Sequence, residues 1–169
     1  MFRCSCSPIH GLCHDIAIIK LTKPVKFSET GRTVCLPTSD DFAWEGETCM
    51  AMGWGKWQKG SDQFSEELRH LPLEVDQDHD GGNHNYLTTF IKKKDDAEGY
   101  WSPCSGDSGG PLVHQDPGTK RWTIIGTLYG DYYNCVNDTR YPGSPENMYA
   151  RWNKVTAHLD WIRSVLAED

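Results

Sequence analysis

The segment from Cys104 to Pro111 carries the residue types that acyl-transfer chemistry needs. It reads Cys-Ser-Gly-Asp-Ser-Gly-Gly-Pro, with a serine set among glycines. A serine hydroxyl becomes a good nucleophile when a base takes its proton, and the oxyanion that develops needs preorganised N–H donors. Glycine lets the backbone approach a substrate closely. The segment therefore predicts Ser108 as a nucleophile, with the backbone N–H groups of Gly106 and Ser108 as an oxyanion hole.

The elements that must position this segment are short strands. Apolar and β-branched runs separated by polar turns predict strands at 15–21, 49–57, 68–75, 111–113, 122–128 and 148–152. Residues 76–101 are polar and charged, which predicts a long surface loop. Apolar residues at helical spacing predict a closing helix from Thr156, with Thr156 as its N-cap.

Composition excludes several classes of protein. Of 169 residues, 37% are hydrophobic and 11% aromatic, which is typical of a globular chain rather than a disordered one. The net charge of −7 and the lack of a basic stripe argue against a nucleic-acid partner. No apolar run approaches the roughly 20 residues of a membrane-spanning helix.

Seven cysteines favour an oxidising compartment, although their number is odd. Residues 1–12 lack the apolar core of a signal peptide. We therefore expect this leader to be incomplete or alternative.

A set of short motifs occurs in a fixed order after residue 13. They are His14-Asp15-Ile16-Ala17, Val34-Cys35-Leu36-Pro37, Gly53-Trp54-Gly55, Gly106-Asp107-Ser108-Gly109-Gly110-Pro111, Tyr149-Ala150-Arg151 and Asp160-Trp161-Ile162. In this order they resemble the chymotrypsin/trypsin family of serine endopeptidases over nearly the whole chain. The resemblance implies an all-β fold of two antiparallel barrels, with the active site between them and a short C-terminal helix.

The resemblance also implies a division of the chain. Residues 1–12 form an atypical leader, and residues 13–167 form the protease domain. Within that domain an incomplete first barrel and a linker take up 13–45. The second barrel takes up 46–155 and the helix 156–167.

The family's site residues map onto this chain one at a time. Ser108 matches the nucleophile, Gly106 an oxyanion-hole donor and Asp15 the aspartate that orients the catalytic histidine. Asp107 matches the aspartate that pairs with an ammonium group released by activation cleavage. No activation motif occurs in this sequence, so we expect Asp107 to lack a partner and the hole to be unformed.

The catalytic histidine of the family stands in an Ala-His-Cys segment, which this sequence does not contain. His10 and His14 are too close to Asp15 along the chain for a base that must reach Ser108. We therefore expect the chain alone to be inactive or very weak as an endopeptidase. The alternative is a non-catalytic homologue that binds protein partners.

The specificity pocket of the family falls on four residues. Ser102 corresponds to the pocket floor and is uncharged, which favours an apolar substrate side chain over arginine or lysine. The walls are Tyr129, Asp131 and Asn147, and this unusual set leaves the specificity open.

By resemblance, Cys104 pairs with Cys135. The usual partner of Cys49 falls on His114, so Cys49 is expected to be a buried free thiol. The candidates to replace the family's partner of Cys35 are Cys4, Cys6 and Cys13.

The acidic stretch 76–81 lacks the glutamate that closes a calcium loop, and His79 and His84 lack further ligands. We expect no metal and no cofactor. The expected partners are protein or peptide substrates and protein inhibitors, and the family resemblance implies a secreted protein.

Overall fold

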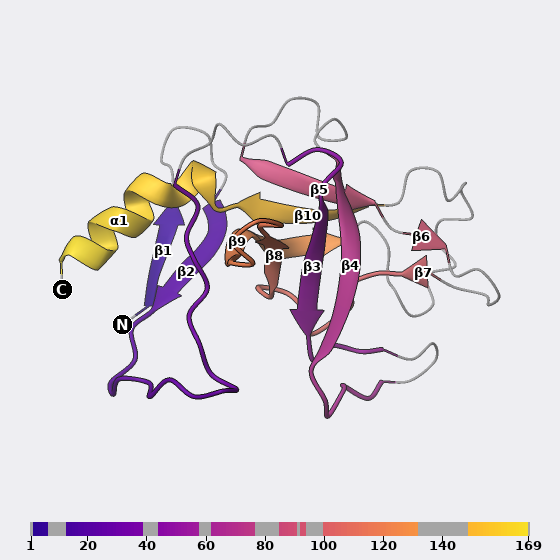
Figure 1. The fold of residues 1–169 in the computed structure, drawn as a ribbon, viewed down its shortest axis with the longest axis horizontal. Helices are drawn as coiled ribbons and strands as arrows, with labels where there is room; N and C mark the ends of the chain where they lie inside the picture. Colours follow the sequence, from indigo (N-terminus) through magenta and orange to yellow (C-terminus); the bar gives the residue numbers. More distant parts are fainter. Residues whose placement is uncertain are drawn as a thin grey trace.

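A closed six-stranded antiparallel barrel forms the centre of the molecule (Figure 1). The computed structural model describes residues 2–6, 13–38, 44–57, 62–76, 85–90, 92–93, 100–131 and 149–168. The strand order around the barrel is β10-β5-β4-β3-β8-β9. These strands are β3 (Thr48–Gly53), β4 (Arg69–Asp76), β5 (Tyr86–Phe90), β8 (Pro111–Gln115), β9 (Trp122–Asp131) and β10 (Tyr149–Lys154). The predicted all-β, chymotrypsin-like fold class is confirmed.

The barrel is filled by side chains that alternate along its strands. Alternate residues of a strand point to opposite faces, so one face of each strand lines the core. In β3 the inward residues are Cys49 and Ala51, and in β10 they are Ala150 and Trp152. The Trp152 indole is buried, and its Nε1 donates a hydrogen bond to the Thr89 hydroxyl at 3.0 Å, which satisfies the one polar atom of the ring.

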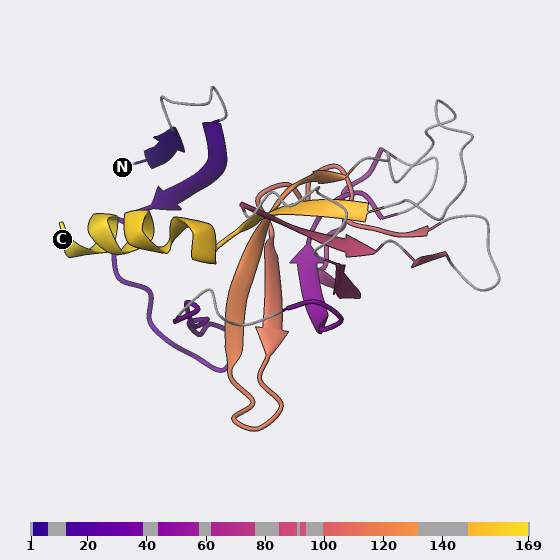
Figure 2. The same ribbon diagram turned by 90° about the horizontal axis from the view of Figure 1, so that it is seen from above.

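A two-stranded ribbon and the terminal helix lie together on one side of the barrel (Figure 2). The ribbon pairs β1 (Phe2–Cys6) antiparallel with β2 (Cys13–Ile19). Helix α1 (Leu159–Ala167) follows the 3-10 turn Thr156–His158. A second apolar cluster joins the two, because residues of β2 pack against the residues before and within α1. Its members are Ile16, Ile18, Ile124, Val155, Leu159, Trp161 and Ile162.

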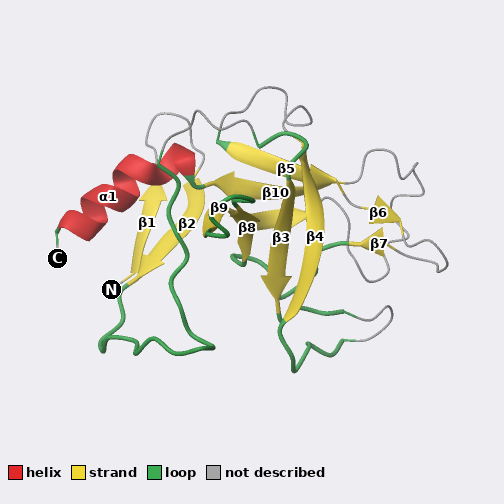
Figure 3. Cartoon of the chain, viewed as in Figure 1, coloured by secondary structure: helices red, strands yellow, loops and turns green. Residues whose placement is uncertain are grey.

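Most of the predicted strands and the C-terminal helix are confirmed within one to four residues at their ends (Figure 3). The prediction of one long loop over 76–101 is wrong. β5 lies in this range and pairs with both β4 and β10, and the short strands β6 (Lys92–Lys93) and β7 (Tyr100–Trp101) pair with each other. β5 is stabilised by its pairing with a neighbouring strand on each side. This pairing is not visible in the sequence, where polar residues surround the strand.

Two further differences concern the ends of the chain. Thr156 is the first residue of the 3-10 turn and does not cap α1, whose N-cap is His158 without a side-chain cap bond. β1 was not expected in the leader. It pairs antiparallel with β2 and so covers one edge of that strand.

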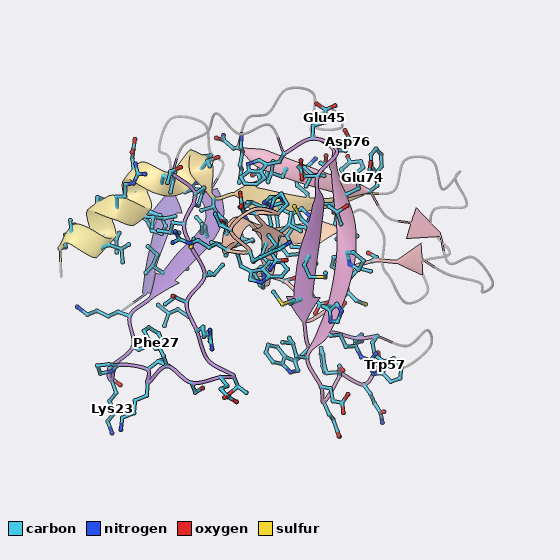
Figure 4. The ribbon with its side chains drawn as sticks, viewed as in Figure 1. Lys23, Phe27, Glu45, Trp57, Glu74 and Asp76 are labelled. Carbon is cyan, nitrogen blue, oxygen red and sulfur yellow. The ribbon has the colours of Figure 1, made fainter. Side chains whose placement is uncertain are left out.

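The segment after β2 exposes apolar side chains. Residues 20–34 form no helix or strand (Figure 3), and Ile19, Leu21, Val25 and Phe27 are 59–71% exposed. In Figure 4 Lys23 and Phe27 lie at one extremity of the molecule and Trp57 at another. Among the described residues, no helix has the length and apolar character needed to cross a membrane.

Candidate active site

The loop that carries Ser108 consists of two consecutive tight turns. The Asp107 N–H donates to the Cys104 carbonyl at 2.8 Å, and the Gly110 N–H donates to the Asp107 carbonyl at 2.8 Å. Each turn contains a glycine in the left-handed region, Gly106 at φ +98° and Gly109 at φ +77°. Only glycine adopts such angles without strain. Ser108 stands exposed as the second residue of the second turn.

The Asp107 carboxylate ties this loop to the segment that follows β3. Its Oδ1 accepts a hydrogen bond from the Gly55 N–H at 2.7 Å, and its Oδ2 accepts one from the Cys104 N–H at 2.8 Å. The expectation that Asp107 lacks a partner is therefore wrong. These partners leave no sign in the sequence because both are backbone N–H groups, which every residue type except proline supplies.

The Gly-Trp-Gly motif explains how the carboxylate fits. A Cβ on Gly53 would lie 1.9 Å from the Asp107 Oδ1, and a Cβ on Gly55 would lie 2.6 Å from the same oxygen. Real Cβ atoms do not approach other atoms so closely, so both positions require glycine. The two glycines of the motif leave the space that the Asp107 carboxylate occupies.

The loop is also held by β9 on its far side. The Gly109 N–H donates to the Leu128 carbonyl at 2.9 Å, and the Leu128 N–H donates to the Gly110 carbonyl at 2.9 Å. Ser108 is therefore next to a residue that is fixed against Leu128.

The Asp15 segment is held at Thr127, the residue of β9 that precedes Leu128. The Asn153 Nδ2 donates to the Asp15 carbonyl at 2.8 Å and to the Thr127 carbonyl at 3.5 Å. Since Thr127 precedes Leu128, the structure anchors the Asp15 and Ser108 segments at adjacent residues of one strand. The Asp15 side chain is exposed. Asn153 was missed from the sequence, because nothing in its local pattern marks a strand asparagine as a link between distant segments.

The described histidine side chains take other roles. His114 is buried in β8, with its Nε2 3.2 Å from the Glu47 Oε2 and its ring edge against Trp44. His158 is buried before α1, and His70 is exposed on β4. Among the side chains that the structure describes, no histidine is hydrogen-bonded to Ser108. His10, His79, His84 and the side chain of His14 lie outside the described part.

Two of the four predicted pocket residues have described side chains. Ser102 is half-buried, and its hydroxyl donates to the Pro103 carbonyl at 2.8 Å. Tyr129 is 45% exposed on β9, and its ring packs against Tyr86 at 5.6 Å between centroids. The Arg151 guanidinium lies 5.4 Å from the centre of the Tyr86 ring. The side chain of Asp131 and the whole of Asn147 lie outside the described residues.

The cysteines follow the sequence-based predictions only in part. Cys49 is a buried free thiol, as predicted, and burial together with the nearby Glu47 carboxylate raises its pKa to about 12. Cys35 is also free, so it is bonded to none of the candidate partners Cys4, Cys6 and Cys13. Its sulfur lies 3.3 Å from an amino group of Arg121, which donates to it.

Cys104 is disulfide-bonded, and its partner is not among the cysteines whose side chains are described. Cys135 lies outside the described residues. The pairing of Cys104 with Cys135 therefore stays a prediction.

The family model described as Trypsin matches residues 7–162 of the chain. The matched range includes the Asp15 segment, all six strands of the barrel and the Ser108 loop, and it ends within α1.

Proposed function

Because this match spans more than half of the chain, the protein belongs to the trypsin family, and we propose that Ser108 is its nucleophile for peptide-bond hydrolysis. The observation that carries the proposal is the loop of two tight turns with Ser108 exposed in the second of them. Such a loop presents the hydroxyl to a substrate from a backbone fixed on both sides by hydrogen bonds to the barrel.

The proposed reaction begins with attack of the Ser108 Oγ on the carbonyl carbon of a peptide bond. A base takes the hydroxyl proton, and negative charge develops on the carbonyl oxygen. The N–H groups of Gly106 and Ser108 stabilise this oxyanion. Removing one donor of such a hole typically costs about 10²–10³ in rate. Expulsion of the amine leaves an acyl-enzyme that water hydrolyses.

Asp15 is proposed to orient the base and to stabilise its protonated form. The hydrogen bonds from Asn153 to Asp15 and to Thr127 support this role, because they fix the Asp15 backbone beside the strand that holds the Ser108 loop. A histidine between the two would complete the triad, and none of the histidine side chains that the structure describes is hydrogen-bonded to Ser108. A triad that lacks one member retains only about 10³–10⁴ over the reaction in water. We therefore propose that the 169-residue chain by itself is at most a weak hydrolase.

The test combines a covalent probe with chemical rescue. A fluorophosphonate reacts with activated serines, and mass spectrometry of the digested product locates the label. We expect slow labelling at Ser108, none in Ser108→Ala, and faster labelling and ester hydrolysis when imidazole is added as an external base. Rapid labelling and peptide hydrolysis without imidazole would show that the chain supplies its own base. Equal behaviour of the wild type and Ser108→Ala would refute the assignment of the nucleophile.

The alternative is a non-catalytic domain that binds protein partners. Two exposed apolar regions favour it: the Ile19–Phe27 segment, and Trp54, Trp57 and Phe64 beside the Ser108 loop. Binding of a substrate-like peptide with an unchanged affinity in Ser108→Ala, without any turnover, would support this alternative.

The family further suggests where the protein acts and on what. We propose protein or peptide substrates, protein inhibitors and a secreted location, with a Cys104–Cys135 bridge behind the nucleophile loop. The remaining pocket assignment, with Ser102 at the floor and Tyr129, Asp131 and Asn147 as walls, belongs to the same proposal. An uncharged floor favours apolar side chains, which a peptide library would test directly.

A further inference from the structure

We propose that Phe64 is a positioning residue that holds Gly106, and with it the orientation of the Gly106 N–H. This role rests on the proposed function only for what the N–H does in catalysis. The Phe64 ring lies directly against Gly106: a Cβ built on Gly106 would lie 2.6 Å from the Phe64 Cε1 and 2.8 Å from its Cδ1. The ring edge thus fills the space beside the glycine where a side chain would otherwise stand.

Two segments brace the loop, residues 53–57 and 62–65, and we call them the bracing segments. Phe64 lies in the second. They pair through an antiparallel bridge between Lys56 and Phe64. The Ser65 N–H adds hydrogen bonds at 3.2 Å to the carbonyls of Trp54 and Gly55. The backbone on both sides of the Phe64 ring is therefore fixed.

The bracing segments hold three consecutive residues of the loop, each in a different way. The Lys56 N–H donates to the Ser105 carbonyl at 2.9 Å, and the Gly55 N–H donates to the Asp107 carboxylate at 2.7 Å. Gly106 lies between these two positions, and its Cα faces the Phe64 ring and the Gly55 Cα.

This contact matters because glycine is the residue whose peptide groups rotate most freely. Gly106 has φ +98°, and glycine populates both signs of φ about equally well. A rotation of the Ser105–Gly106 peptide would turn the Gly106 N–H away from the site beside Ser108. The Phe64 ring and the Gly55 Cα pack against the Gly106 Cα and so resist a shift of this residue, while the bond from the Lys56 N–H holds the carbonyl of the same peptide.

The same geometry makes Phe64 a suitable residue to substitute. Its side chain is 57% exposed, so its removal takes little from the barrel core. Phe27 is a matched control, since it is the same residue type, is 71% exposed and lies at a distant extremity of the molecule near Lys23 (Figure 4). Phe64→Tyr keeps the ring edge that touches Gly106 and serves as the conservative variant.

The test measures the Gly106 N–H itself by ¹⁵N relaxation in the 169-residue chain. We expect an order parameter of about 0.85 in the wild type and in Phe64→Tyr, and below about 0.6 in Phe64→Ala. The Asp107 amide, which is bonded to the Cys104 carbonyl, should exchange about tenfold faster in Phe64→Ala, while core amides such as that of Leu112 stay protected. Phe27→Ala should match the wild type in both measurements.

An unchanged Gly106 order parameter in Phe64→Ala, or an equal change in Phe27→Ala, would overturn the proposal. If Phe64→Ala also loses core protection, Phe64→Leu, which keeps apolar bulk without the ring edge, gives the same comparison in a folded chain. Fluorophosphonate labelling of Ser108 is measured separately. A mobile Gly106 in Phe64→Ala without any labelling of the wild type supports the positioning role and refutes the hydrolase. Labelling of Ser108 in the wild type, with an unchanged Gly106 order parameter in Phe64→Ala, supports the hydrolase and refutes the positioning role.

Discussion

Replacing Asp107 with asparagine tests how the Ser108 loop is held. The Asp107 carboxylate accepts one backbone hydrogen bond on each oxygen, from Gly55 at 2.7 Å and from Cys104 at 2.8 Å. Asparagine has nearly the same shape but only one acceptor oxygen. Its NH₂ group would face one of the two backbone N–H groups, so that two donors meet.

The expected cost follows from these two bonds. A hydrogen bond to a charged group contributes about 1.5–3 kcal/mol, a neutral one about 1 kcal/mol, and a buried donor left without a partner costs about 1–3 kcal/mol. Asp107→Asn exchanges two charged bonds for one neutral bond and leaves one donor unpaired. Because Asp107 is only half-buried, water relieves part of that cost. We expect the free energy of unfolding to fall by about 2–4 kcal/mol.

Urea unfolding followed by tryptophan fluorescence measures this change. Asp160→Asn is the matched control, because Asp160 is fully exposed and its carboxylate lies 4.0 Å from the Arg163 guanidinium. Such a surface pair contributes about 0–1 kcal/mol. Amide exchange at Gly55 and Cys104 should increase in Asp107→Asn alone. If both variants lose the same small free energy, the carboxylate does not hold the loop and the reasoning fails.

The remaining predictions concern the cysteines and the exposed apolar segment. Iodoacetamide at pH 8 should leave Cys49 unmodified in the folded chain, because its pKa is raised to about 12; modification seen by peptide mapping would contradict its burial. Since 9.0 is the ordinary pKa, the stability due to the protonated Cys49 is present below pH 9 and falls as the pH rises towards 12. Urea unfolding should show this loss in the wild type and a smaller one in Cys49→Ala. His114→Cys should form a disulfide with Cys49, because Met50 pairs with Val113 one position along; the closed loop predicts roughly 4 kcal/mol, and a urea midpoint that dithiothreitol shifts no more in the variant than in the wild type would exclude the bond. We expect the exposed Leu21 and Phe27 to drive self-association in sedimentation velocity, which Leu21→Ser with Phe27→Ser should reduce; equal association with the wild type would place the contact elsewhere.

The strands could be predicted where their own residues carry the signal. In β3 and β4, buried and exposed residues alternate with the period of a strand, so the sequence pattern was sufficient. β5 carries buried Leu87, Thr88 and Thr89 in a range that is otherwise polar, and its pairing with β4 and β10 stabilises it. β1 could not be predicted, because it is a strand through its pairing with the edge of β2, and the residues of β1 do not show that pairing.

The site shows the same division. Ser108 and Gly106 were found because serine chemistry and left-handed turns demand particular residue types at a fixed spacing. The partners of Asp107 were missed, because backbone N–H groups leave no mark in the sequence. Phe64 was missed because an exposed aromatic residue in a polar stretch gives no local sign of the glycine that it touches. The division of the domain at 45 and 155, and the roles of the site residues, stay predictions.

The sequence by itself determined the family, the all-β class and the residues around Ser108. Side-chain chemistry, turn geometry and strand alternation are local properties, and they survive in the order of the residues. Only the tertiary structure decided that Asp107 is satisfied by Gly55 and Cys104, that Asp15 and Ser108 are anchored at adjacent residues of β9, and that Phe64 rests on Gly106. These contacts join segments that are distant along the chain through backbone groups and van der Waals contact, which depend on the closure of the barrel and not on any one residue type.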